Sequence, residues 1–60
     1  MTKEYLIEFH WIGSYVKVSA LDPVTNTEVS IVGDARATEN ELKNTAIKKL
    51  KYVINKSQPK

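Results

Sequence analysis

The chain of 60 residues contains no cysteine and has a single histidine, His10. Without cysteine there is no disulfide bridge and no thiolate metal site, and one histidine does not make a metal cluster. Its two glycines, Gly13 and Gly33, stand alone, so there is no glycine-rich loop to hold a phosphate. Glu8 and His10 share a strand face, but such a pair is more often a surface ion pair than an acid-base couple. We expect no cofactor, no metal and no enzymatic activity.

Long hydrophobic runs are also missing. No stretch approaches the ~20 apolar residues that cross a bilayer, and the N-terminus lacks the basic-then-apolar pattern of a signal peptide. We therefore expect a soluble cytoplasmic protein with no membrane partner. The length allows one domain, predicted at residues 1–56, with 57–60 as a disordered tail. Because so short a chain buries only about 60% of its unfolded surface, self-association is the stabilising aid that the composition leaves open.

Alternating apolar and polar residues predict three strands, at about 3–12, 15–22 and 27–33. Gly13-Ser14 is typical of a two-residue type II′ turn, with glycine at the position that needs positive φ. In the second turn Asp22 can accept a backbone hydrogen bond, and Asn26 tolerates the left-handed conformation. Facing residues should then have numbers that sum to 27 in the first strand pair and to 49 in the second. Both registers place the same apolar face inward.

A helix is predicted at about 38–56. Thr38 and Glu41 fit a capping box, and Leu42, Ala46 and Leu50 begin an apolar stripe at helical spacing. The predicted fold class is α+β, a three-stranded antiparallel meander packed on one face by a C-terminal helix, in the order βββα. The predicted core consists of Tyr5, Ile7, Phe9, Val16, Val18, Ala20, Val29, Ile31, Leu42, Ala46, Leu50 and Val53. Trp11, at a strand end, is expected to cap this core over the helix terminus.

Nothing in this arrangement covers the opposite face of the sheet, where we place the candidate interaction site. Isolated exposed apolar side chains are ordinary, so a plain solvated face is one interpretation. The other is a small interaction module that forms a homodimer, through this face or a sheet edge, or docks an unknown protein partner. The candidate residues are Leu6, Glu8, His10, Ile12, Tyr15, Lys17, Ser19, Leu21, Ser30 and Val32.

The charge distribution raises an alternative. Residues 1–35 carry five acidic and two basic side chains, whereas residues 36–60 carry seven basic and two acidic ones. Some DNA-binding domains lay a small sheet into the major groove, so weak, salt-dependent nucleic-acid binding is the second hypothesis. Glu8 and Glu28 on the sheet face would repel phosphate. The chain also has only one arginine, the side chain that most often makes specific contacts with bases. The contacts would come from Lys17, Arg36, Lys43, Lys48 and Lys51.

Several short runs spread over nearly the whole chain carry a family resemblance. They are Glu8-Phe9, Ile12-Gly13-Ser14-Tyr15-Val16-Lys17-Val18, Leu21-Asp22-Pro23, Thr25, Thr27-Glu28-Val29, Ile31-Val32-Gly33, Glu41-Leu42-Lys43 and Lys49-Leu50. With these runs the chain resembles a family of short uncharacterised bacterial proteins, chiefly alphaproteobacterial. Members usually have glycine in place of Asn26 and proline in place of Asp34. The family has no assigned activity, so the resemblance implies a complete protein but no functional residues.

Overall fold

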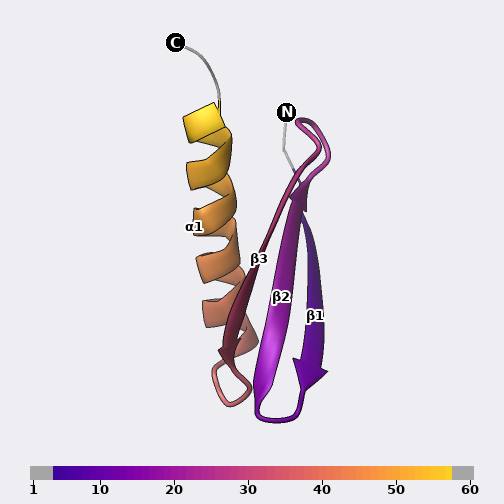
Figure 1. Ribbon diagram of the computed structural model, residues 1–60, viewed down its shortest axis with the longest axis vertical. Helices are drawn as coiled ribbons and strands as arrows, with labels where there is room; N and C mark the ends of the chain where they lie inside the picture. The colour runs from indigo at the N-terminus through magenta and orange to yellow at the C-terminus, as the bar shows by residue number, and fades with distance from the viewer. Residues whose placement is uncertain (1–3, 58–60) are drawn as a thin grey trace.

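The computed structural model describes residues 4–57, which form a sheet of three strands followed by one helix (Figure 1). The strands are β1 (Leu6–Ile12), β2 (Tyr15–Asp22) and β3 (Thr27–Asp34), antiparallel in the order β1-β2-β3, and the helix is α1 (Glu39–Ser57). The predicted βββα architecture is confirmed. Residue 3 of the predicted first strand and residues 58–60 of the predicted tail lie outside the described residues. Residues 4 and 5, also predicted as strand, precede β1; β3 ends one residue later than predicted; and Ser57, predicted in the tail, belongs to the helix.

The first turn fixes the β1–β2 register. Gly13 has a φ of 59°, and nothing lies within reach of a Cβ there, so the backbone conformation is what favours glycine. Positive φ at the first central residue is the signature of the type II′ hairpin, whose twist matches that of the strands. The pairs run from Leu6 opposite Leu21 to Ile12 opposite Tyr15, which confirms the predicted register.

The second turn is held by the Asp22 carboxylate. The Val24 N–H donates to Asp22 Oδ1 at 3.0 Å, and the Thr25 hydroxyl donates to Oδ2 at 3.2 Å. Asn26 adopts the left-handed conformation, with φ of 58°. The β2–β3 pairs run from Asp22 opposite Thr27 to Tyr15 opposite Asp34. Both features of the predicted turn, and the register that follows from them, are confirmed.

Hydrogen bonds to Asp34 and Thr38 stabilise the connection between β3 and α1. The Arg36 N–H donates to Asp34 Oδ1 at 2.8 Å, and the Ala37 N–H donates to the Asp34 carbonyl at 2.9 Å. Thr38 then acts as the N-cap, because its hydroxyl accepts the Glu41 N–H at 3.1 Å. The helix starts one residue later than predicted, since the capping residue itself is not helical.

Seven apolar side chains are buried between the sheet and the helix: Val16, Val18, Ala20, Val29, Leu42, Ala46 and Leu50. The other predicted core residues, Tyr5, Ile7, Phe9, Ile31 and Val53, pack against this cluster but stay partly exposed, as do Ala37 and Ile54. Five of the seven buried side chains are alanine or valine and the other two are leucine, so the core is small. A core of this size in a chain under 70 residues supplies only about 3–5 kcal/mol of net stability.

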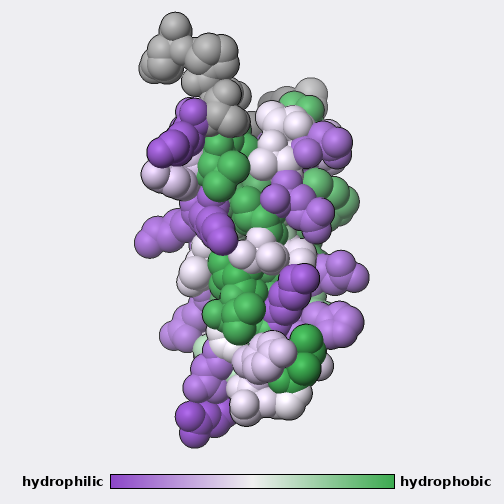
Figure 2. All heavy atoms as spheres, in the orientation of Figure 1, coloured by the Kyte–Doolittle hydropathy of each residue, from purple (hydrophilic) through white to green (hydrophobic). Residues whose placement is uncertain are grey.

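The lateral position of α1 is the feature that the sequence pattern did not show. The helix packs on β2 and β3 and hardly touches β1, the strand farthest from it in Figure 1. Figure 2 shows hydrophilic side chains on the outer side of α1 and hydrophobic ones along its seam with the sheet. Trp11 is therefore half exposed and stacks on Phe9, with ring centroids 5.5 Å apart, instead of capping the core. That expectation was wrong.

Gly33 gives a first testable prediction. It lies inside β3, and a Cβ added there would overlap the buried Leu42 side chain of α1. Gly33→Ala should lower the free energy of unfolding by about 1 kcal/mol, the low end of the range for overpacking. Urea denaturation measures the loss. In a Leu42→Ala background the same substitution should cost clearly less, and an equal cost in both backgrounds would show that Leu42 is not the obstacle.

Candidate functional site

The outer face of the sheet, opposite α1, holds all ten residues of the predicted interaction site. The two registers arrange this face in four rows across the strands. The rows are Leu6–Leu21–Glu28, Glu8–Ser19–Ser30, His10–Lys17–Val32 and Ile12–Tyr15–Asp34. In each end row the β1 and β2 residues are apolar or aromatic and the β3 residue is acidic, whereas the two middle rows are polar or charged except for Val32.

Exposed apolar side chains on this sheet concentrate on β1. Leu6 is 57% exposed and Ile12 is 42% exposed, and Trp11 on the inner face of the same strand is 50% exposed. Tyr15 and Val32 are exposed on β2 and β3, whereas Leu21 is partly covered. A strand with large apolar side chains exposed on both of its faces is unusual for a solvated surface.

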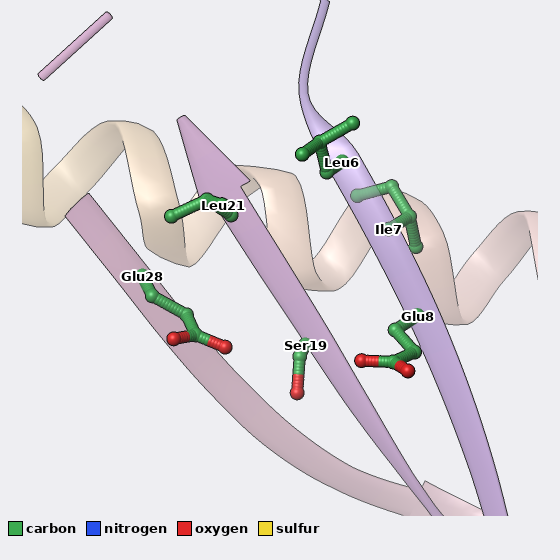
Figure 3. Close-up of a pocket in the computed structure, with 6 residues that line it drawn as sticks. All are labelled: Leu6, Ile7, Glu8, Ser19, Leu21 and Glu28. Atoms are coloured by element: carbon green, nitrogen blue, oxygen red, sulfur yellow. The ribbon is translucent and has the colours of Figure 1, made fainter. Parts of the chain in front are cut away.

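A shallow depression of about 350 Å³ lies at the β1 N-terminal end of the outer face (Figure 3). It is lined by Leu6, Ile7, Glu8, Ser19, Leu21 and Glu28. Figure 3 shows Glu8 on β1 and Glu28 on β3 on either side of Ser19. The next row carries Lys17 and His10, so negative and positive side chains occupy neighbouring rows of the face.

The two edges of the sheet differ. In an antiparallel ladder, successive residues direct their backbone groups alternately to either side. The Ala35 N–H donates to the Ser14 carbonyl at 3.1 Å, which continues the β2–β3 pairing and sets that alternation for β2. The even-numbered residues of β2 therefore bond to β3, and its odd-numbered residues bond to their even-numbered partners on β1. The odd-numbered residues of β1, Ile7, Phe9 and Trp11, must then direct their backbone groups away from β2, toward the open edge.

At the β3 edge, a side chain of α1 occupies one of the outward-facing backbone groups. Lys49 Nζ, on α1, donates to the outward-facing carbonyl of Ser30 on β3 at 3.0 Å. A lysine at a sheet edge is a common device against pairing with another strand. For β1, no such side-chain donor or acceptor contacts the edge within residues 4–57.

Between β1 and α1 runs a groove that sequence reasoning missed, because the pattern does not tell which strands the helix covers. At one end a hollow of about 400 Å³ is lined by Phe9, Glu39, Asn40 and Lys43. At the other a hollow of about 220 Å³ is lined by Tyr5, Lys51, Ile54 and Asn55. The inner side of β1 is thus open at these two hollows and at the half-exposed Trp11, whereas Ile7 and Phe9 are partly buried against the core.

A family comparison matches nearly the whole of this domain. The model of a family described as a domain of unknown function (DUF6898) matches residues 2–57. The chain belongs to this family. No curated protein and no solved structure matches it. The expectation of an uncharacterised domain family is confirmed, and the features described above are those of a DUF6898 chain.

The cations of the second hypothesis lie on different surfaces of the DUF6898 chain. Lys17 is on the outer sheet face, whereas Lys43 and Lys51 line hollows beside α1 on the other side of the sheet. Lys48 is exposed on α1. Arg36 is engaged with Asp34, with Nη2 and Oδ2 3.3 Å apart. The Arg36 side chain, followed by its backbone N–H, holds the pKa of the Asp34 carboxyl below its ordinary value.

Two classes of site can be checked directly on the described residues. Residues 4–57 contain no group of three or more histidine, cysteine, aspartate or glutamate side chains placed to hold a metal ion. Within the same residues, no helix has the length and the apolar character needed to cross a membrane.

Proposed function

We propose that this DUF6898 chain is a small interaction module that self-associates. The observation that carries the proposal is the one-sided cover by α1, which leaves β1 exposed on both faces and along its edge. Leu6 and Ile12 on the outer face and Trp11 on the inner face are all accessible. A second copy paired along β1 would contact all three side chains at once.

The energetics favour the same proposal. Seven buried apolar side chains give the monomer only marginal stability. Full burial of a large apolar side chain contributes about 1.5–3 kcal/mol, so covering even part of the exposed side chains of β1 would be a large gain for so small a core. Association also carries a cost in lost rotational and translational freedom, and after that cost we expect an affinity in the micromolar range or weaker.

Nucleic-acid binding stays the second hypothesis. The lysines of α1 support it, since a duplex could contact exposed ammonium groups by charge alone. The separation of Lys17 from the helix lysines by the thickness of the sheet counts against a single contact surface. An affinity for DNA that falls as the salt concentration rises would identify such charge-driven binding.

Self-association predicts a mass that depends on concentration. Sedimentation equilibrium over about 1 μM to 1 mM should show the apparent mass rising from that of one chain toward that of two, the range set by micromolar to millimolar affinity. A mass of one chain at every concentration would contradict the proposal. A parallel series with a short DNA duplex at low salt tests the second hypothesis, which requires a complex that weakens steeply as salt is raised.

A further inference from the structure

The geometry points to a specific mode of self-association. We infer that two copies pair through their β1 edges, antiparallel, about a two-fold axis that passes beside Phe9. This inference rests on the proposed function and names its interface. The two sheets then join into one continuous sheet, and the strand order runs from β3 of one copy through both β1 strands to β3 of the other.

The backbone groups at the two sheet edges favour β1 over β3 as the pairing strand. The backbone N–H and C=O groups of Ile7, Phe9 and Trp11 point outward from the sheet, ready to bond an added strand. On β3, the carbonyl of Ser30 is already bonded by Lys49, and that of Asp34 by the Ala37 N–H. Pairing at β3 would have to share or displace these donors, whereas pairing at β1 disturbs none of the bonds described.

The sequence of β1 is self-complementary. Read in either direction from Phe9, it presents one polar residue and then two large apolar ones, the polar residue being Glu8 on one side and His10 on the other. When Phe9 faces Phe9 of the partner, Glu8 faces His10 of the partner on the outer face. Leu6 then faces Ile12 of the partner on the same face, and Ile7 faces Trp11 of the partner on the inner one. Each of these cross-strand contacts occurs twice, because the axis repeats it.

Neighbouring registers lack this match. The outward-facing residues of β1 are the odd-numbered ones, so the next registers that form hydrogen bonds place the axis at Glu8 or at His10. The first sets Glu8 against Glu8 of the partner and Leu6 against His10 of the partner. The second sets His10 against His10 of the partner and Glu8 against Ile12 of the partner. Like groups, or a charge and an apolar side chain, then face each other, which specifies the register centred on Phe9.

The helix leaves room for this pairing. A two-fold axis perpendicular to the sheet puts both copies of α1 on the same face, and each packs on its own β2 and β3. The inner face over the two β1 strands stays clear of helix. There the stacked rings of Phe9 and Trp11 adjoin those of the partner, which covers the half of Trp11 that one chain leaves exposed.

Cysteine cross-linking tests the register, because the chain has no cysteine of its own. Glu8→Cys and His10→Cys change exposed positions, so both variants should fold. Mixed and mildly oxidised, they should form the disulfide between unlike chains, since facing residues of a strand pair lie within bridging distance. Either variant oxidised alone should stay largely uncoupled. Preferential coupling of like chains would reveal a shifted register and overturn the inference.

A charge exchange gives an independent test on the same two residues. Glu8→His alone, or His10→Glu alone, sets like groups opposite each other and should weaken dimerisation about two- to thirty-fold. The double variant with both changes restores unlike pairs and should return the dimerisation constant to near that of the native chain. Equal weakening by the double variant would contradict the facing pair.

Two further outcomes distinguish pairing through the β1 edge from self-association in general. Leu21→Ser lies on the central strand, away from the β1 edge, and should leave the dimer intact. A dimer that Leu21→Ser abolishes, with no coupling between unlike cysteine variants, would keep self-association but move it to the outer sheet face. A chain that is monomeric at all concentrations would refute both.

Discussion

Leu50→Ala is expected to lower the free energy of unfolding by about 2–5 kcal/mol, the range for truncating a buried leucine. Leu50 is fully buried at the middle of the apolar stripe of α1 and is the largest of the fully buried side chains. With about 3–5 kcal/mol to lose, most or all of the folded population would disappear at room temperature. Circular dichroism with urea titration measures the change, at one fixed chain concentration because association adds to apparent stability.

Tyr52→Ala is the matched control for this substitution. It removes a larger side chain from the same helix, but Tyr52 is exposed, and the Lys56 ammonium group lies 5.8 Å from its ring centre. Its cost should stay within about 1 kcal/mol. If the two substitutions had similar effects, α1 would not be packed on the sheet through the face that Leu50 occupies.

Asp22→Ala should be the next most damaging change, at about 1.5–3 kcal/mol. Asp22 is fully buried, and its carboxylate accepts the Val24 N–H and the Thr25 hydroxyl. Alanine would remove both acceptors and loosen the turn that sets the β2–β3 register. Thermal unfolding followed by circular dichroism would show a lower midpoint.

Asp22→Asn separates hydrogen bonding from charge at the same position. The asparagine carbonyl can still accept the Val24 N–H, and its amide group can donate to the Thr25 hydroxyl. Most of the stability should therefore be kept. A loss as large as that of alanine would indicate that the negative charge, rather than the hydrogen bonds, supports the turn.

The sequence was sufficient for the topology and for both strand registers, because short hairpin loops leave little freedom. A two-residue turn with glycine at Gly13 permits one closing pair, and the Asp22 and Asn26 chemistry does the same for the second turn. Once the closing pairs are set, every other pair follows along the strands. The end of the third strand was predicted one residue early, at Gly33, whereas β3 continues to Asp34, and nothing in the sequence indicated that the missing side chain of Gly33 leaves room for Leu42.

The lateral placement of the helix was not accessible in the same way. Helical periodicity tells which side of α1 faces the sheet, but not which strands lie beneath it. That depends on how the whole core packs, here as a buried cluster that includes Ala20 of β2, Val29 of β3 and Ala46 of α1. The exposure of Trp11 and the groove between β1 and α1 both follow from this placement.

For the candidate site, the sequence predicted which residues share the outer face but not which edge of the sheet is open. The symmetry of β1 about Phe9 is visible in the sequence itself. This symmetry indicates a pairing of two β1 strands only when β1 is known to be an edge strand whose odd-numbered residues direct their backbone groups outward. The bond from Lys49 to Ser30, which joins residues 19 positions apart, has no signal in the local pattern.

That bond from Lys49 also bears on how large an assembly can grow. A sheet with two open edges can add subunits at both ends and polymerise into a fibre. When the β1 edges are joined, the outermost strands are the two copies of β3, each with its Ser30 carbonyl occupied by a lysine. In the proposed pair, Lys49 would disfavour the addition of a further strand at β3, so growth would end at two copies.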